Sequence, residues 1–510
     1  MHVDFPIFRI EWVGSSRLIR RWRMYLARGE FTCVLVRESL LFVLNKKRLE
    51  GLSMDDLKNL MISVSGVRGI VGDGLTPQVV TRFAQAYGSE FGPGRIVVGR
   101  DSRTTGDMVK YAVWAGLLST GCDVVDLGIA PTPTTEMVTE LSEHAGGIII
   151  TASHNPKEWN ALKLLAPDGL FLDTEQGEKI AVRVRENDFD YAPWNKIGRV
   201  IPCVKAIDTH IRAILNLSPI DVHKIREKRF KVVVDCCHGA GGTILPDLLD
   251  ELGCKCVFLN LEPNGLFPRN PEPIPAHLGE LCKGVISHRA DLGIAVDPDV
   301  DRLALVSEKG EPLGEEYTLA LVTELVLSKK KGQVVVNAST SRVIDDIASK
   351  YSCPVHRTRV GEIHVATKAR EVSAVIAGEG NGGVIYPELH LGRDAPVGIG
   401  LVLQLLAEMD RPVSEIYNTL PHYTMIKDKI SLPFEADARG IVAGLRDIHK
   451  QDELDTTDGL KFLYDNAWVH IRASNTEPII RVIAEATTQK ETERLVDRFK
   501  AEISMLESRV

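Results

Sequence analysis

Three aspartates, Asp297, Asp299 and Asp301, stand at alternate positions in the stretch AVDPDVDRLALV. In an extended segment alternate side chains point to one face, so the three carboxylates would share a face. Carboxylates about 5 Å apart repel by roughly 3 kcal/mol per pair at an effective dielectric of about 20, and a bound divalent cation removes that cost. A small set of hard oxygen ligands suits Mg²⁺, which keeps waters or a phosphate in its shell. The pattern therefore predicts a magnesium site.

This stretch has three other interpretations. A calcium-binding EF-hand matches Glu308 at loop position twelve, but Arg302 stands where position six needs glycine. An aspartyl nucleophile of the haloacid-dehalogenase type would have Thr or Val in place of Asp301. An acidic surface turn is the third alternative; the apolar runs on both sides argue against it, because unpaired buried charges are costly.

A serine on a sharp polar turn is the candidate nucleophile. The run GGIII (residues 146–150) leads into TASHNP, which places Ser153 beside His154. Lys163 follows ten residues later as a candidate acid or base. The alternative is that Ser153 caps a helix or turn, a common role for serine.

Two arginine-bearing turns have the composition of phosphate sites. In HIRASNTEPIIR (residues 470–481), a guanidinium fork, two hydroxyls and an amide come from Arg472, Ser474, Asn475 and Thr476. Arginine grips phosphate with paired hydrogen bonds, and the hydroxyls serve the remaining oxygens. Arg68, between glycines in SVSGVRGIVGDGLT, offers similar chemistry. Ordinary turns of similar composition are the alternative for both.

A glycine-rich stretch beginning GEGNGG (residues 378–383) carries Glu379 and Asn381. Glycines allow close approach of the backbone to a ligand, and a carboxylate with an amide suits vicinal sugar hydroxyls. A mobile glycine-rich loop is the alternative. Taken together, a metal site, phosphate cradles and a serine predict phosphoryl transfer, in which positioning and charge neutralisation supply the catalysis.

Length and composition limit the class of protein. A chain of 510 residues exceeds one hydrophobic core, so three or four domains are expected. The net charge of −8 argues against general nucleic-acid binding, and no apolar run approaches the length of a membrane span. The nine cysteines are scattered, with no zinc-type pairs, as expected of a protein in a reducing cytoplasm.

From Met61 onward, short β-branched runs alternate with helical patterns, which predicts repeated α/β domains with largely buried sheets. Runs at 95–100, 146–151, 230–235 and 292–297 are examples. The last 85 or so residues instead combine strand-like runs with a final charged helix, an α+β pattern. Polar, proline-rich breaks give the expected domains 61–203, 204–309, 310–424 and 425–510.

The first 60 residues are expected to be an N-terminal extension outside this plan. Residues 1–53 hold ten Lys or Arg against five acids. The stretch RLIRRWRMYLARGE (17–30) is consistent with a basic amphipathic helix at a membrane surface or a targeting segment. The favoured interpretation is an extension upstream of the true start, with Met54 or Met61 as the initiator.

Four motifs in this order, TASHNP, DPDVDR, GEGNGG and RASNTEP, resemble those of the α-D-phosphohexomutases. This family includes phosphoglucomutase, phosphomannomutase and phosphoglucosamine mutase. The resemblance runs from about Met61 to the C-terminus. It implies four domains around a central cleft, three related α/β domains with mixed sheets and a smaller α+β domain, each contributing one loop.

The resemblance also implies roles for the residues singled out above. Ser153 would be phosphorylated, and Mg²⁺ would be held by a phosphoserine oxygen and the three aspartates. Arg302 would lie beside the phosphoserine, and Glu379 would grip sugar hydroxyls. The turn at Arg472 would bind the phosphate that is not transferred. Proton transfer and charge stabilisation would fall to Lys163, His154 and Arg68.

The implied reaction interconverts a hexose 1-phosphate and 6-phosphate through a hexose bisphosphate, which would also serve as activator. The loop departs from the common GExSGH pattern, because Asn381 and Gly383 replace Ser and His, and Pro298 stands where many members have Gly. The GEGNGG form looks most like the archaeal and Bacteroidetes-type phosphoglucosamine mutases, which favours glucosamine phosphate and leaves mannose and glucose phosphates open. A sugar-phosphate phosphatase and a non-catalytic sugar-phosphate binding protein are the other hypotheses. We expect a monomer or homodimer.

Overall fold

The computed structural model describes residues 23–27, 30–37, 40–43, 60–63, 66–141, 143–433, 437–474 and 479–507. The chain divides into two compact units, Met1–Asn59 and Leu60–Val510. In the first, three antiparallel strands form one sheet: β1 (Arg23–Ala27), β2 (Glu30–Arg37) and β3 (Leu40–Val43). The alternative of a helix over 17–30 is therefore wrong at Arg23–Ala27, where pairing with the β-branched run of β2 overrides helical propensity.

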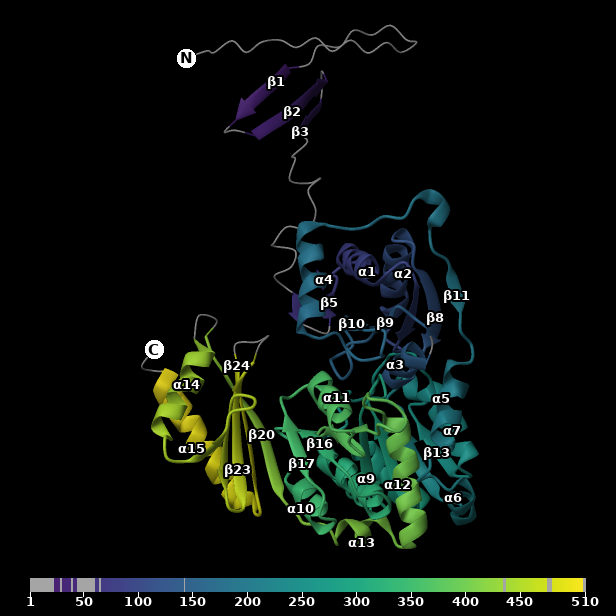
Figure 1. Ribbon diagram of the computed structural model, residues 1–510, viewed down its shortest axis with the longest axis vertical. Coiled ribbons are helices and arrows are strands. Elements are labelled where there is room, and N and C mark those ends of the chain that lie inside the picture. The colour runs from purple at the N-terminus through teal and green to yellow at the C-terminus, as the bar shows by residue number, and fades with distance from the viewer. Residues whose placement is uncertain are drawn as a thin grey trace. The chain divides into compact units, whose positions relative to one another are not determined.

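The second unit begins with a large mixed sheet in the order β11-β8-β7-β9-β10-β5-β4, with β6 paired to β5 (Figure 1). Its strands are β4 (Leu60–Ser63), β5 (Gly66–Val71), β6 (Gly74–Leu75), β7 (Arg95–Arg100), β8 (Asp123–Ile129), β9 (Gly146–Ile150), β10 (Trp159–Leu165) and β11 (Val200–Pro202). The helices of this region are α1 (Pro77–Phe91), α2 (Gly106–Ser119), α3 (Thr132–Leu141) and α4 (Thr174–Glu186). Local sequence sets their starts: Thr76 caps α1, with proline in its first turn, and Asp173 with Gln176 forms a capping box on α4.

Two four-stranded sheets follow. The first has the order β13-β12-β14-β15 and the second β17-β16-β18-β19. The strands are β12 (Lys231–Asp235), β13 (Lys255–Leu259), β14 (Leu292–Val296), β15 (Leu303–Ser307), β16 (Val334–Asn337), β17 (Val355–Thr358), β18 (Ile376–Glu379) and β19 (Gly383–Ile385). The helices are α5 (Ala206–Leu215), α6 (Val222–Lys228), α7 (Leu245–Glu251), α8 (Gly279–His288), α9 (Glu315–Lys329), α10 (Val343–Lys350), α11 (Glu362–Glu371), α12 (Ala395–Met409) and α13 (Val413–Tyr417). Short 3-10 helices cover Trp194–Lys196, Ala240–Thr243 and Pro275–His277.

The same four-strand core occurs in all three sheets. In each, the first strand in sequence (β7, β12 or β16) pairs in parallel with the second and third, and the third pairs antiparallel with the fourth. The loop between the third and fourth strands therefore occupies the same place in each domain. These loops contain Ser153, the aspartate triplet and the GEGNGG stretch, so one topology presents three of the four predicted site segments.

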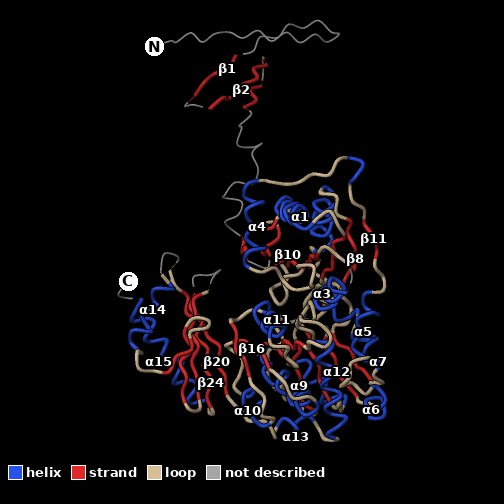
Figure 2. Tube along the Cα trace, in the orientation of Figure 1, coloured by secondary structure: helices blue, strands red, loops and turns tan. Residues whose placement is uncertain are grey.

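The C-terminal domain is a single antiparallel sheet in the order β20-β24-β23-β22-β21, drawn in yellow-green in Figure 1. Its strands are β20 (Thr424–Ser431), β21 (Glu453–Asp455), β22 (Leu460–Tyr464), β23 (Ala467–Ala473) and β24 (Ile479–Ala486). Helices α14 (Ala438–Ile448) and α15 (Gln489–Glu507) pack together on one face of this sheet (Figure 2). The prediction of three related α/β domains with mixed sheets and a smaller α+β domain is confirmed.

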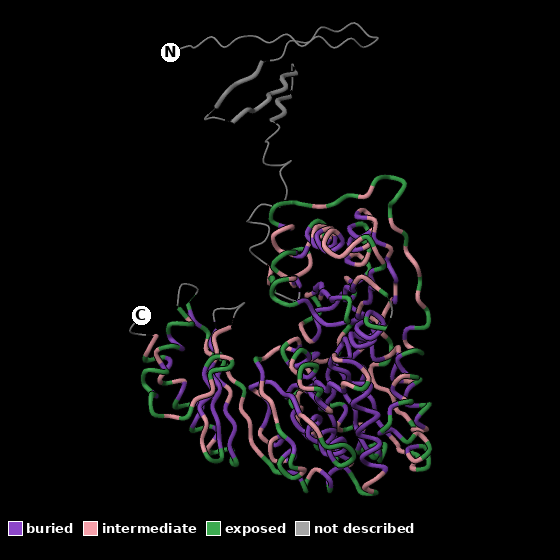
Figure 3. The backbone as a smooth tube through the Cα atoms, viewed as in Figure 1, coloured by how far each residue is buried: buried purple, intermediate pink, exposed green. Residues whose placement is uncertain are grey.

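One continuous core joins the second and third α/β domains. It combines side chains of β12 and β14 with those of β16 and β18, and helices α9 and α12 contribute along most of their lengths. Strands β14 and β15 are buried at every residue, as their apolar runs predict. The backbone around α9 and α12 is likewise mostly drawn as buried in Figure 3. The strands that carry the aspartate loop and the GEGNGG loop therefore share one hydrophobic core. Within the part of the chain that the structure describes, no helix is both long and apolar enough to cross a membrane.

Candidate active site

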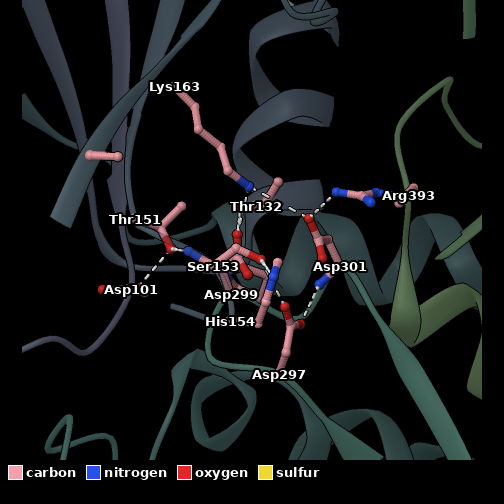
Figure 4. Close-up of polar contacts among 12 residues, drawn as sticks. Asp101, Thr132, Thr151, Ser153, His154, Lys163, Asp297, Asp299, Asp301 and Arg393 are labelled. Atoms are coloured by element: carbon pink, nitrogen blue, oxygen red, sulfur yellow. Dashed lines mark hydrogen bonds and ion pairs between the residues drawn. The ribbon is translucent and has the colours of Figure 1, made fainter. Parts of the chain in front are cut away.

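The serine loop and the aspartate loop meet at a hydrogen bond between their central residues. The Ser153 Oγ donates to Asp297 Oδ2 at 3.0 Å, and the His154 Nδ1 lies 3.4 Å from the same Oγ (Figure 4). Ser153 is only 4% exposed and has a φ of +49°, in the left-handed region that non-glycine residues rarely adopt. Burial, backbone strain and contact with a carboxylate favour a catalytic role for Ser153 over a capping role.

Buried polar groups hold this strained turn in place. The Ser153 amide donates to Thr151 Oγ1 at 2.9 Å, and the Thr151 hydroxyl donates to Asp101 Oδ2 at 2.6 Å. Arg103, with its side chain fully buried, pairs with Asp101 and donates to the carbonyl oxygens of Ser153, Asn155, Pro156 and Trp159. One guanidinium thus holds three carbonyls of the serine loop and the first carbonyl of β10. Arg103 was not predicted as a site residue, although it lies three positions after a predicted strand, in GRDSR.

The three aspartates lie together, fully buried, with one carboxylate oxygen from each within 4.8 Å of the others. The alternation predicted a shared face in a strand, but the residues occupy the turn after β14, and the turn brings them together. Asp297 Oδ1 accepts from the amides of Asp301 and Arg302, both at 3.2 Å. No described residue donates to the buried Oδ1 atoms of Asp299 and Asp301. These orphaned carboxylate oxygens fit a hard divalent cation such as Mg²⁺.

Charge and burial oppose each other in the triplet. Burial raises the pKa of Asp297 well above its usual range, and the charges of Asp301 and Asp299 raise it further. Burial also disfavours ionised Asp299, but the Lys163 ammonium and hydrogen bonds more than offset this and lower the pKa of that carboxyl. The three buried carboxylates therefore cannot all ionise without cost, and a bound cation would favour the ionised form of each.

Lys163 lies on β10, the strand that follows the serine loop and pairs with β9. Its ammonium group contacts the triplet. Its Nζ lies 2.8 Å from Asp299 Oδ2 and 3.5 Å from Asp301 Oδ2. Burial lowers the pKa of Lys163, but the two aspartates raise it by more, so the amine stays protonated at neutral pH. Thr132, missed by the sequence analysis, also donates to Asp299 Oδ2, at 2.8 Å. Its place at the start of α3 gave no signal that could have found it.

Two further arginines and a histidine belong to the neighbourhood of the serine loop. Arg68 donates to Asn155 Oδ1 at 2.5 Å, and Arg302 donates to Glu272 Oε1 at 3.1 Å. The positive charge of Arg302, then burial and the charge of Arg68, lower the pKa of His154 well below its usual range. His154 is therefore a neutral imidazole beside a hydroxyl, in a region of positive potential that suits phosphate.

Glu379, at the end of β18, is held by four donors, of which Asn381 Nδ2 is the most distant, 3.5 Å from Oε2. Its Oε1 accepts from Asn337 Nδ2 at 2.8 Å and from the Gly361 amide at 3.1 Å, and its Oε2 accepts from Arg393 Nη1 at 2.8 Å. Asn381 uses its Oδ1 to accept from the Gly383 amide at 3.1 Å, so its side chain shapes the turn. These contacts favour a binding role for the loop over the mobile-loop alternative.

The fourth segment lies on β23 and β24. Arg472 sits opposite Arg481 in the strand register, and its Nη1 is 3.1 Å from Asp458 Oδ2. The amide of Ser474 donates to the carbonyl of Ile479 at 2.9 Å, next to the paired ends of β23 and β24. Asn475 and Thr476 lie outside the described residues. Arg481 was missed, although it follows the motif in EPIIR.

A cavity of about 380 Å³ brings segments of all four domains together. Of the predicted residues, it is lined by Arg68, Lys163, Arg302, Glu379, Asn381 and Arg472. Arg393, Lys427 and Arg481 add positive charge that the sequence analysis did not anticipate. A mostly cationic cavity next to a serine and a carboxylate triplet can hold an anionic substrate with a sugar-sized body.

Comparison with known proteins gives a consistent picture. Four family models match in order: the phosphoglucomutase/phosphomannomutase alpha/beta/alpha domains I, II and III at residues 60–191, 208–310 and 314–423, and the C-terminal domain at 430–502. The chain is 41% identical over 441 residues to the phosphoglucomutase/phosphomannomutase of Thermococcus kodakarensis, covering 85% of this chain and 96% of that protein. It is 38% identical over 440 residues to a probable phosphoglucosamine mutase of Methanopyrus kandleri, with the same coverage.

Solved structures agree with this picture. A phosphoglucomutase/phosphomannomutase family protein from Burkholderia thailandensis superimposes with a TM-score of 0.76 at 27% identity, covering 88% of this chain and 98% of that one. A putative phosphomannomutase from Thermus thermophilus gives a TM-score of 0.75 at 26% identity, covering 88% and 99%. The matches by sequence family begin at residue 60, at the start of the second compact unit.

Proposed function

Because the chain belongs to the phosphoglucomutase/phosphomannomutase family of phosphohexomutases, we propose that it interconverts glucosamine 6-phosphate and glucosamine 1-phosphate through a phosphoserine at Ser153. The observation that carries the proposal is the 3.0 Å contact between the Ser153 hydroxyl and Asp297, beside two orphaned carboxylate oxygens. Several relatives named as probable phosphoglucosamine mutases support the choice of sugar. The relative named phosphoglucomutase/phosphomannomutase keeps glucose and mannose phosphates as the alternative.

In the proposed reaction the P–O bond to Ser153 Oγ breaks as a bond forms from phosphorus to a free sugar hydroxyl. The product is a hexose bisphosphate. This intermediate reorients in the site and then returns its other phosphoryl group to Ser153. A bisphosphate would therefore also activate the enzyme by phosphorylating it. Asp297, Asp299 and Asp301, with a phosphoserine oxygen, would hold Mg²⁺, which supplies neutralisation of the phosphoryl charge when bound.

The remaining residues bind and move charge. Lys163 stays protonated and stabilises the negative charge of the transferring group, with Arg68 and Arg302. His154 offers an uncharged ring nitrogen close to Oγ, able to accept the proton that the sugar hydroxyl releases.

Substrate binding falls to the cavity. Glu379 and Asn381 would contact sugar hydroxyls, and the turn of Arg472, Ser474, Asn475 and Thr476 would grip the phosphate that is not transferred. Arg481, opposite Arg472, adds a second guanidinium to this turn. A site that recognises the charge of a phosphate rather than the identity of the sugar can bind either phosphate of the substrate. The proposed reaction needs this property because its intermediate reorients.

The test is a coupled assay of the purified protein on glucosamine, mannose and glucose phosphates, each with its bisphosphate, followed by phosphopeptide mapping. We expect the highest kcat/KM with glucosamine phosphate, phosphate on Ser153, and loss of activity in Ser153→Ala. Ser287→Ala, an exposed serine on α8, is the control. Mutase activity that survives in Ser153→Ala would sink the proposal, and steady release of inorganic phosphate would indicate a phosphatase instead.

A further inference from the structure

Arg393 connects the aspartate loop to the GEGNGG loop through a single side chain. Its Nη2 lies 2.7 Å from Asp301 Oδ2 and its Nη1 lies 2.8 Å from Glu379 Oε2. Its Nε lies 3.1 Å from Glu362 Oε2, and its amide donates to Glu362 Oε1 at 2.7 Å. The side chain is 10% exposed. Three carboxylates from two domains thus share one guanidinium in a largely dry setting, where such contacts are strong.

The surroundings leave Arg393 little freedom to move. A side chain on Gly383 would collide with the aliphatic part of Arg393, so the glycine at this place in GEGNGG makes room for it. The next residue, Asp394, caps α12 by accepting from the Val397 amide at 2.9 Å. The other carboxylate oxygen of Asp394 contacts the Nε2 atoms of His210 and His390 at 2.8 and 3.0 Å.

That His–Asp–His cluster is a structural support, and its hydrogen bonds argue against a second metal site. The Gly392 amide donates to His390 Nδ1 at 3.0 Å, so Nδ1 carries the lone pair and Nε2 carries the proton given to Asp394. A metal would need the lone pair at Nε2 instead. The cluster therefore fixes the backbone that presents Arg393 to the two loops.

We propose that Arg393 is a positioning residue that couples cation binding at Asp301 to the grip of Glu379 on the sugar. The inference rests on the proposed function, because it assigns the cation to the triplet and the sugar to Glu379. In the absence of a cation, Arg393 divides its charge among three carboxylates. A cation at Asp301 neutralises one of them, which leaves the guanidinium to hold Glu379 more firmly in its binding orientation. Each ligand then raises the affinity for the other by the same factor.

Lysine cannot replace arginine in this role. An ammonium is a point charge and cannot span Asp301 and Glu379 with two separate donors, whereas the planar guanidinium spans them with Nη2 and Nη1. Arg393→Lys therefore keeps the positive charge and breaks the link. Arg393→Met removes both the positive charge and the link. It leaves the three neighbouring carboxylates without the guanidinium that they share.

The coupling is measured by titrating glucosamine 6-phosphate into protein whose serine is shown by intact mass to be unphosphorylated, in EDTA and in saturating Mg²⁺. Without phosphoserine or bisphosphate the proposed reaction cannot turn over, so calorimetry reports equilibrium binding. Coupling between two sites in proteins is typically about 5- to 150-fold in affinity. We expect the wild-type ratio of the two Kd values to lie in this range and to fall at least about fivefold in Arg393→Lys. If the substrate phosphate itself contacts the cation, Mg²⁺ will still change the Kd in Arg393→Lys. The readout is therefore the difference between the Kd ratios of the wild type and of Arg393→Lys.

Arg183→Lys is the matched control, since Arg183 also contacts three carboxylates, those of Glu90, Asp188 and Asp190, and does not line the cavity. It should leave the ratio unchanged. Arg393→Met separates coupling from collapse of the site: we expect weaker sugar-phosphate binding with Mg²⁺ affinity, titrated without sugar, equal to or higher than that of the wild type, because a nearby positive charge is gone.

The inference would be overturned if the ratio of the two Kd values in Arg393→Lys lay within twofold of the wild-type ratio. It would also be overturned if the wild-type protein had the same Kd in EDTA and in Mg²⁺. Loss of both affinities together in Arg393→Met would also count against it, since that indicates general damage to the site. None of these outcomes depends on turnover. Failure of the proposed function would instead appear as a wild-type protein that lacks mutase activity.

Discussion

The Ser153 hydroxyl lies 3.0 Å from the Asp297 carboxylate although 144 positions of sequence separate them. The contact exists because the two residues occupy equivalent loops, each between the third and fourth strands of a repeated sheet. Domains of the same topology can present equivalent loops to a common cavity. Repetition of one α/β plan therefore brings a serine, an acidic triplet and the Glu379 carboxylate together, and each of these parts has a separately measurable contribution.

The acidic triplet should set the Mg²⁺ requirement. Asp299→Asn removes one negative charge from the cluster, and cation affinity depends on the number of charged ligands. We expect the Mg²⁺ concentration for half-maximal activity to rise by about tenfold or more, since a hydrogen bond to a charged group contributes about 1.5–3 kcal/mol. A magnesium titration of activity measures this, with Asp428→Asn, a surface partner of Lys500, as the control. An unchanged titration curve in Asp299→Asn would refute the assignment.

Arg103 should govern turnover more than substrate binding. Arg103→Lys keeps a positive charge but cannot reach the four carbonyl groups that the guanidinium holds around Ser153. Misplacement of a reacting group by about 1 Å can cost about 10²-fold in rate, so we expect kcat to fall by about that factor while KM stays within about threefold. Steady-state kinetics provide the split, and circular dichroism verifies folding. Arg82→Lys, which donates to a carbonyl far along the chain at Val184, is the control. A raised KM at normal kcat would show that Arg103 does not position the serine.

The turn that carries Arg472 should contribute equally to the binding of the 1-phosphate and the 6-phosphate. Arg472→Ala removes a guanidinium from the cavity wall, and the loss of a charged hydrogen bond of about 1.5–3 kcal/mol corresponds to a rise in KM of about 10- to 100-fold. Because one cradle serves either phosphate, the KM values of the 1-phosphate and the 6-phosphate should rise by similar factors. Arg498→Ala, on α15, should change neither. A rise confined to one of the two substrates would mean that the turn binds only one end of the sugar.

Lys461 should make stability depend on pH. Burial, with a contribution from Arg357, lowers the pKa of Lys461 to about 7, and its Nζ donates to the Ala338 carbonyl at 2.8 Å. Between the folded pKa and the unfolded value near 10.4, the unfolded chain binds more protons, so this group adds up to about 1.4 kcal/mol of stability per pH unit as pH rises. That gain is absent below about pH 7, where the folded and unfolded states both carry the proton.

Lys461→Met lacks this dependence, so its melting temperature relative to wild type should be highest near pH 7 and should decline toward pH 9. Lys368→Met, which removes a surface lysine paired with Glu371, should show no such trend. Parallel melting curves of wild type and Lys461→Met across this range would mean that Lys461 is charged in the folded protein.

Much of the fold and the site could be predicted from local sequence. Unbroken apolar runs such as those of β14 and β15 are buried on both faces, and only a sheet covered on both sides accommodates them. Motifs with distinctive chemistry, such as TASHNP and DPDVDR, stand out because residue type and spacing within a few positions decide what they can bind. Ser153, the triplet, Glu379 and Arg472 were found in this way.

Other features depend on contacts between distant segments, which local patterns do not encode. The sequence showed no clean repeat, yet three sheets share one order of strands, because strand pairing tolerates any residues of suitable hydrophobicity. Arg103, Arg393 and Arg481 look like ordinary surface arginines in their own neighbourhoods. Only packing decides that two of them are buried against carbonyls or carboxylates and that the third faces Arg472.

The sequence by itself thus determined the inventory of reactive groups and the alternation of strands and helices, because both follow from short-range chemistry. The tertiary structure alone decided which oxygens of Asp299 and Asp301 are left without a donor, which arginine bridges two loops, and which serine conformation is enforced. Those properties arise from distances between groups far apart in the chain, where burial strengthens each charge interaction and leaves few arrangements that satisfy them all.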